Sequence, residues 1–126
     1  MKFYSRRVVK PEDLNPAEML FGGRLLSWID EEAAIFAACQ MESTRLVTKC
    51  ISAIDFRRPA LQGDVIEFGL ELAGHGRTSI TIRCEVRNKL TKAAIVTIDA
   101  MVFVCLDERG KPAPHGLGTR LATPAG

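Results

Sequence analysis

The stretch GGRLLSWIDEEAAIFAACQM, residues 22–41, contains the one long helical pattern in this chain of 126 residues. Gly22-Gly23 opens it, and apolar residues then recur at three- and four-residue spacing from Leu25 to Ala37. Other apolar residues fall on further sides of the same pattern. The spacing therefore predicts a helix from residue 24 to about residue 41 that is buried by more than one surface.

The sequence around this helix has the two-residue period of strands. Runs of this kind cover residues 46–56, 65–73, 78–88 and 93–106, and a shorter run at 5–9 precedes the helix. Hairpin-like links between the last four runs favour antiparallel pairing. We therefore predict an α+β fold in which a curved antiparallel sheet of about five strands wraps one long central helix.

Length and composition fit a single domain. The 126 residues leave little room for a second one. Hydrophobic residues make up 47% and charged residues 25%, the balance of an ordinary soluble globular protein. A formal net charge of +2 does not indicate a nucleic-acid surface, although it suits an anionic small ligand. We assign residues 1–109 to the domain and residues 110–126, which are rich in Gly and Pro, to a surface tail.

The sequence favours a cytoplasmic protein without a metal site. The first ten residues lack the apolar region of a secretory signal, and no segment approaches the ~20 apolar residues of a membrane span. The cysteines lie far apart, without C-x-x-C spacing and without a nearby histidine, so we expect reduced, buried thiols. They are Cys39, Cys50, Cys84 and Cys105.

Asp30 is the strongest candidate for a chemical role. It lies within a largely apolar helix, where a carboxylate loses solvation and needs a reason to be present. The plainer interpretation is a solvated carboxylate that the helix dipole favours. His75 in a predicted turn and His115 in the predicted tail are weaker candidates, because histidines in loops are usually just exposed.

The segment Asn15-Pro16-Ala17-Glu18-Met19-Leu20-Phe21-Gly22-Gly23, followed by Trp28-Ile29-Asp30, resembles the active-site segment of hot-dog-fold acyl-CoA thioesterases. The likeness continues through Arg58-Pro59, Gly63-Asp64, Gly76-Arg77-Thr78-Ser79 and residues 107–112, and so covers almost the whole chain. Members of this family often have a glycine where this chain has Ala17-Glu18-Met19. The resemblance implies the hot-dog fold, a homodimer often assembled into a hexamer (a trimer of dimers), and hydrolysis of acyl-CoA without a further cofactor.

The resemblance also implies roles for individual residues. Asp30 matches the catalytic acidic position, where it would be a general base on water or a nucleophile that forms an anhydride. Asn15 matches an asparagine of the same segment, whose amide would place the water or the carbonyl. Backbone N–H groups of Gly22 and Gly23 at the helix N-terminus would hold the oxyanion. The plainer alternatives are a tight turn at the two glycines and an ordinary turn asparagine before proline.

The coenzyme is expected to contact a second set of residues. The turn Gly76-Arg77-Thr78-Ser79 resembles the family's coenzyme-binding turn, and Arg58 resembles a basic residue near it. Arginine suits phosphate because its fork binds two oxygens at once, although these arginines are otherwise ordinary solvated strand positions. The predicted substrate-binding residues are Gly22, Arg58, Gly76, Arg77, Thr78 and Ser79.

Two other functions compete with hydrolysis. A hot-dog dehydratase pairs a histidine with an acid, and neither His75 nor His115 lies in the helix segment. A non-catalytic acyl-CoA-binding or sensing module is the alternative from another class. The presence of both Asn15 and Asp30 argues against it, because a binding module has no need of a costly buried carboxylate. The expected partners are acyl-CoA and further copies of this chain, and neither nucleic acid nor a membrane.

Overall fold

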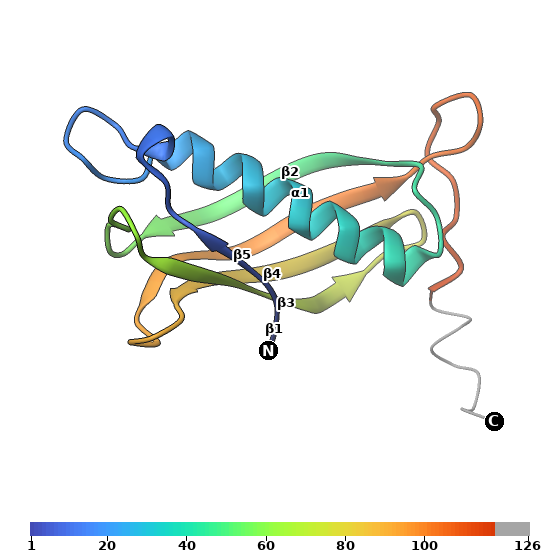
Figure 1. Cartoon of the computed structure of the whole chain (residues 1–126). Coiled ribbons are helices and arrows are strands. Elements are labelled where there is room, and N and C mark those ends of the chain that lie inside the picture. The colour runs from blue at the N-terminus through green and yellow to red at the C-terminus, as the bar shows by residue number, and fades with distance from the viewer. Residues whose placement is uncertain (118–126) are drawn as a thin grey trace.

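The computed structural model describes residues 1–117 and contains one long helix on a five-stranded antiparallel sheet. The strand order is β1-β3-β4-β5-β2, and Figure 1 shows α1 lying along one face of the sheet. The predicted α+β architecture is therefore confirmed. The elements are β1 (Lys2–Val8), η1 (Pro11–Asp13), α1 (Gly22–Met41), β2 (Leu46–Phe56), β3 (Val65–His75), β4 (Ser79–Asn88) and β5 (Ala94–Cys105).

The core lies between α1 and the sheet. Five residues of α1, each four positions after the last, are buried in one stripe that faces the sheet. They are Leu25, Ile29, Ala33, Ala37 and Met41. The sheet contributes alternate residues of its inner strands, with Ile66, Phe68 and Leu70 of β3 and Ile80, Ile82, Cys84 and Val86 of β4 all buried. Of the helices within residues 1–117, none is long and apolar enough to cross a membrane.

The first strand was predicted too late in the chain. β1 covers Lys2–Val8 and pairs with β3 from Lys2↔Leu70 to Val8↔Val65, with an irregularity between Phe3 and Ser5. Burial nonetheless alternates regularly along Lys2–Val8, so residues 2–4 continue the strand that was predicted to begin at Ser5. Gly69 of β3 makes room for the early residues, because a Cβ there would lie 2.7 Å from both the Met1 sulfur and the Phe3 ring.

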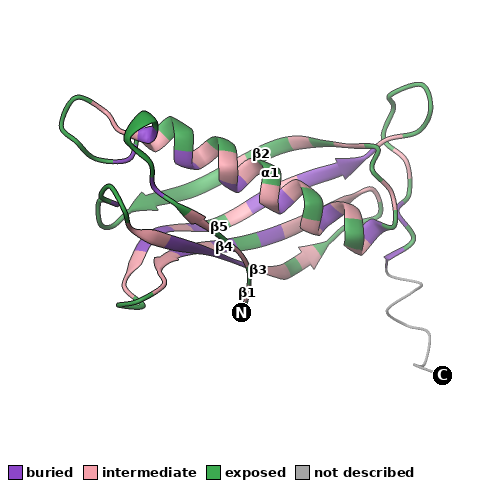
Figure 2. Cartoon of the chain, viewed as in Figure 1, coloured by how far each residue is buried: buried purple, intermediate pink, exposed green. Residues whose placement is uncertain are grey.

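Strand β2 forms an open edge of the sheet. It pairs with β5 on one side, and Figure 2 shows most of the strand exposed. Val47, Ile54 and Phe56 remain 46%, 37% and 51% exposed, although all three are large apolar side chains. An uncovered strand edge with apolar side chains is a template for pairing with another strand.

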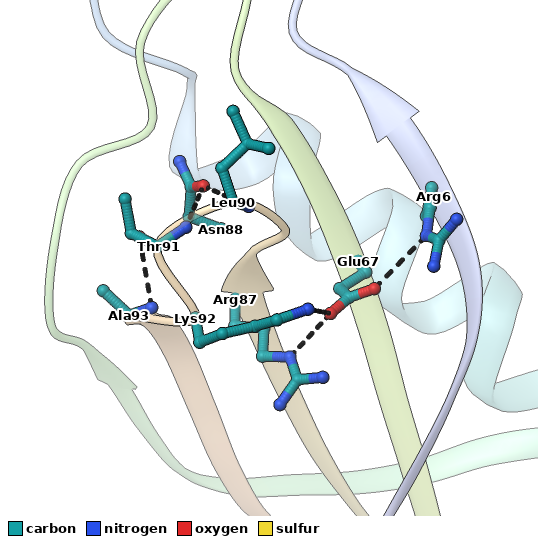
Figure 3. A network of polar contacts seen from close by, with 8 residues as sticks. All are labelled: Arg6, Glu67, Arg87, Asn88, Leu90, Thr91, Lys92 and Ala93. Carbon is teal, nitrogen blue, oxygen red and sulfur yellow. Dashed lines mark hydrogen bonds and ion pairs between the residues drawn. The ribbon is translucent and has the colours of Figure 1, made fainter.

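A charged row crosses the face of the sheet that points away from α1. Glu67 of β3 lies opposite Arg6 of β1 and Arg87 of β4 in the strand register. Figure 3 shows Arg87 and Lys92 meeting one oxygen of its carboxylate, at 2.7 and 3.4 Å, while Arg6 meets the other at 3.3 Å. Burial by itself raises the pKa of Glu67, but the hydrogen bonds from Arg87 and Arg6 and the charge of Lys92 outweigh it, so the pKa lies below its ordinary value.

The segment after β5 is more closely packed than the predicted surface tail. Ala113 N–H donates to Cys105 O (2.8 Å) and His115 N–H donates to Arg77 O (3.2 Å). His115 and Leu117 are buried, so this part of the expected tail belongs to the domain. A tail was predicted because the segment lacks periodicity, which tertiary packing does not require. The remainder of that prediction, residues 118–126, lies outside the described residues.

The prediction of buried cysteines is correct for two of the four. All four are free thiols, with Cys84 and Cys105 buried but Cys39 and Cys50 exposed. Burial raises the pKa of Cys84 to about 12. Cys50 is exposed because β2 is an edge strand with little packed against it, which its sequence pattern does not reveal.

Candidate active site

The loop before α1 is held in shape by Asn15. Its side-chain oxygen accepts hydrogen bonds from Ala17 N–H (2.9 Å) and Met19 N–H (3.1 Å), and its backbone N–H donates to Met19 O (2.7 Å). Glu18, within this turn, adopts a left-handed conformation with φ +63° at the point where relatives were expected to have glycine. Because the Asn15 oxygen is used by the loop, its amide N–H₂ group is the part of the side chain left to meet a ligand.

Asp13, which no motif in the sequence singles out, fixes the start of the helix. Its carboxylate is buried, accepts a hydrogen bond from Lys10 N–H (2.9 Å) and lies 3.9 Å from the guanidinium of Arg24. Its backbone oxygen accepts the N–H of Phe21, the residue before the helix, at 3.0 Å. An aspartate after proline is an ordinary feature of a short turn, so its sequence gives no separate signal.

The first turn of α1 presents free amides. Leu25 N–H donates to Phe21 O (3.0 Å), which closes the first helical hydrogen bond. Helix geometry then leaves the N–H groups of Gly22, Gly23 and Arg24 without a helical acceptor, at the positive end of the helix dipole. Gly23 is exposed, and a Cβ on it would meet no heavy atom within 4 Å, so nothing in this chain covers that side of the residue.

Three predicted site residues line one cavity beside this helix end. Asn15, Gly22 and Arg58 surround a space of about 230 Å³, together with apolar side chains that include Met19 and Phe56. Arg58 lies at the end of β2 and donates from Nη1 to Ala94 O (3.0 Å), which fixes its guanidinium. The combination of apolar walls, one amide and a cation suits a ligand with an alkyl part and a polar or anionic part.

Asp30 is not among the residues that line this cavity. It lies two turns further along α1, half-buried, and accepts a hydrogen bond from the Thr48 hydroxyl at 2.7 Å. Asp30 follows Gly22 by eight positions, which corresponds to about 12 Å along the helix. Within one chain, therefore, the carboxylate and the cavity form two separate half-sites.

Thr48 is a residue that sequence reasoning missed. It projects from β2 toward α1 and fixes one oxygen of the Asp30 carboxylate. Threonine is among the commonest strand residues, so one threonine in a strand-like run carries no signal. Only the folded structure shows that this threonine, and not another, lies beside Asp30.

The predicted coenzyme turn lies at the opposite end of the molecule from the cavity. Figure 1 shows the β3–β4 hairpin near the C-terminal end of α1 and the Asn15 loop near its N-terminal end. The resemblance had implied that Arg58 lies near this turn. Within one chain, however, the structure places Arg77 and Arg58 far apart. Gly76 and Arg77 are exposed, whereas Thr78 and Ser79 are half-buried.

The C-terminal segment supports this hairpin through its backbone. Cys105 N–H donates to Thr78 O (2.8 Å), and the His115 ring lies 2.8 Å from Ser79 O through Nε2. Because Nδ1 of His115 accepts the N–H of Leu117 (2.9 Å), the ring proton is assigned to Nε2. His75 is exposed, with its ring 5.8 Å from that of His115. Both histidines thus lie at the hairpin and not beside Asp30.

No grouping of three or more His, Cys, Asp or Glu within residues 1–117 is arranged to hold a metal ion.

The comparisons with known proteins agree with one another. The model of the thioesterase superfamily matches residues 17–94 of this chain. An uncharacterized acyl-CoA thioester hydrolase of Bacillus subtilis, YkhA, is 35% identical over 115 residues, which are 84% of this chain and 63% of that protein. The acyl-CoA thioester hydrolase YciA of Salmonella typhimurium is 32% identical over 115 residues, which are 86% of each protein. The crystal structure of a hexameric thioesterase from Yersinia pestis has a TM-score of 0.83 at 29% identity, with 90% of this chain and 93% of that chain covered.

Proposed function

This chain belongs to the thioesterase superfamily, as a hot-dog-fold acyl-CoA thioesterase, and on that premise we propose how its two half-sites hydrolyse the thioester. Asp30 is the general base or nucleophile. The Asn15 amide and the N–H of Gly23 stabilise the reacting carbonyl, and Gly22 and Arg58 contact the substrate. The two half-sites meet between two copies of the chain. One observation carries the proposal. Asp30 accepts a hydrogen bond from Thr48 of the edge strand β2, and the other end of the same strand lies at the Asn15 cavity.

The chemistry follows from the groups available. The Thr48 hydroxyl occupies Oδ1 of Asp30, which leaves Oδ2 to accept a proton from water or to attack the carbonyl itself. Attack places negative charge on the thioester oxygen. Preorganised N–H donors at a helix N-terminus stabilise that charge as it develops. The C–S bond then breaks and coenzyme A leaves as its thiol or thiolate, either directly or with an anhydride intermediate that water hydrolyses.

Pairing of two β2 strands would bring the half-sites together. A two-fold axis near the middle of the strand, close to Ser52, joins two copies antiparallel through the same edge. Thr48 of each copy then comes beside Phe56 of the other, because the two residues lie at equal distances from Ser52. Asp30 of one copy accordingly faces the Asn15 cavity of the other. The uncovered edge and exposed apolar side chains of β2 support this arrangement.

Assembly beyond the dimer and the coenzyme contacts complete the proposal. The Yersinia pestis neighbour is hexameric, and we propose that dimers of this chain assemble in the same way. Arg77, exposed at the β3–β4 hairpin with Thr78 and Ser79 beside it, is proposed to bind coenzyme phosphate, as is Arg58 at the cavity. Because the two arginines lie at opposite ends of the fold, a single coenzyme would contact them from different copies.

A thiol-release assay on a panel of acyl-CoA substrates tests the proposed function. Asp30→Asn should lower kcat by about 100-fold or more, the scale of lost acid–base catalysis, while coenzyme A binding and the melting temperature stay near their wild-type values. Glu31→Gln is the matched control, because it removes the adjacent, exposed carboxylate and should leave kcat unchanged. Tight acyl-CoA binding by a wild-type protein that releases no thiol would favour the sensing module instead.

A further inference from the structure

Phe56 is a large aromatic residue in an unusual position. It is the last residue of β2, pairs with Val96 of β5, and remains 51% exposed. Phe68 and Phe103, by comparison, are fully buried in the core. From the sequence, Phe56 is predicted only to end a strand. Its ring forms one wall of the cavity that also contains Asn15 and Arg58.

The ring touches the first residue of α1. Its Cε1 and Cζ atoms lie 3.3 and 3.4 Å from the position that a Cβ on Gly22 would occupy. The corresponding position on Gly23 is open to 4 Å. The two adjacent glycines therefore serve different needs. The missing side chain at Gly22 makes room for Phe56, whereas Gly23 is exposed and borders open space.

This asymmetry defines how a ligand can lie at the helix end. Because the ring fills the space beside Gly22, a carbonyl bound at the amide of the adjacent Gly23 would lie close to the Phe56 ring. The remaining walls of the cavity are largely apolar, with Met19 and Pro59 at the surface and Leu25 buried. An alkyl chain next to that carbonyl therefore meets an apolar surface whose extent depends on Phe56.

We propose that Phe56 determines acyl-chain specificity, with its ring acting as the wall against which the acyl group of the substrate ends. This inference rests on the proposed function and adds that the site selects substrates by the length of the acyl chain. The ring limits the length available beside Gly22, and a smaller side chain at this position opens the cavity to longer acyl groups.

Chain-length profiles of three variants test the proposal. For each protein, kcat/KM is measured on acyl-CoA substrates from acetyl to palmitoyl. Phe56→Ala should raise the ratio of long-chain to short-chain kcat/KM by about tenfold or more, because even one methylene in an apolar pocket changes kcat/KM by roughly 10- to 200-fold. Phe56→Trp should lower the same ratio, and Phe56→Leu should lie between wild type and Phe56→Ala. Opposite shifts for larger and smaller side chains cannot arise from general damage to the fold.

Tyr4→Ala is the control variant. Tyr4 is also a half-exposed aromatic residue, 59% exposed, but it lies on β1 and packs against Phe36. Its loss should leave the chain-length ratio unchanged. An equal loss of kcat/KM for all chain lengths in the Phe56 variants would overturn the proposal. So would dissociation of the dimer with an unchanged ratio, because Phe56 would then be an interface residue alone.

A double-mutant cycle examines the contact itself. Gly22→Ala places a methyl group against the ring and should lower kcat/KM, and Phe56→Leu in the same chain should recover part of that loss. Additive losses would contradict the contact. Failure of the proposed function is distinguishable, because non-hydrolysable acyl-CoA thioethers of different lengths report the same Phe56-dependent preference in Kd without any catalysis.

Discussion

A mixing experiment tests whether each active site is shared between two chains. The two variants are Asp30→Asn, which removes the proposed base, and Asn15→Asp. The second substitution keeps the oxygen that accepts Ala17 N–H and Met19 N–H but removes the N–H₂ donor, so the loop retains its hydrogen bonds. Each variant alone is expected to lose most of its turnover.

The expected recovery follows from the geometry. Asp30 lies about 12 Å along the helix from Gly22 and does not line the cavity, so the half-sites of one chain do not meet. In a mixed dimer, one of the two shared sites then holds both intact residues and the other holds neither. Random pairing of equal amounts makes about half of the dimers mixed, so about a quarter of wild-type kcat per site should return.

Thiol release after co-refolding measures this recovery, and two different affinity tags verify that mixed dimers have formed. A mixture of Asp30→Asn with Thr48→Val is the negative control. These two residues belong to the same half-site, so each site of that mixed dimer contains one defect and no activity should return. No recovery for the first mixture, despite proven subunit exchange, would refute the shared site.

Three further predictions follow from individual contacts. Arg77→Ala should raise KM for acyl-CoA more than it lowers kcat, and the effect should shrink on a pantetheine thioester that lacks the phosphates; equal losses on both substrates would assign Arg77 a structural role. Glu18→Gly should raise the free energy of unfolding by about 0.5–1 kcal/mol in urea titrations, because it relieves a left-handed non-glycine residue, whereas Glu18→Ala retains φ +63° and should not. Glu67→Gln should destabilise the fold by about 2 kcal/mol at pH 7, because it removes the charge that three cations share. The folded-state pKa of Glu67 lies below its ordinary value of 4.5, so wild type should lose this stability as the pH falls below 4.5. The free energy of unfolding of the variant should depend less on pH in this acidic range.

The elements were predictable where one period continues without interruption. The predicted helix begins two residues late, and β2, β4 and β5 agree with their predicted bounds to within one residue. β3 continues two residues beyond its predicted end, through Gly74 to His75. These residues still pair with β4, although the apolar pattern of the sequence has already ended. β1 begins three residues before its predicted start and ends one residue before its predicted end, because its pairing with β3 extends from Lys2 to Val8.

The site was predictable only in part, because its members depend on tertiary packing. Asn15, Gly22 and Arg58 were identified from a linear motif, and the structure places all three around one cavity. Thr48, which contacts Asp30, and Phe56, which lines the cavity, could not be singled out from the sequence because both are typical strand residues. Their relation to Asp30 and Gly22 exists only once β2 lies beside α1, and no spacing within the sequence encodes that neighbourhood.

In the proposed dimer, strand β2 would connect assembly with catalysis. Its apolar side chains and unpaired edge would favour aggregation in a chain that worked alone, and within β2 only Lys49 and Asp55 carry charge. The strand also holds Thr48 against Asp30 near one end and Phe56 against Gly22 at the other. On the proposed two-fold pairing, covering the edge and completing the site are the same event. An isolated chain would then contain every catalytic group and still lack an active site, because its carboxylate and its cavity lie too far apart to act on one carbonyl.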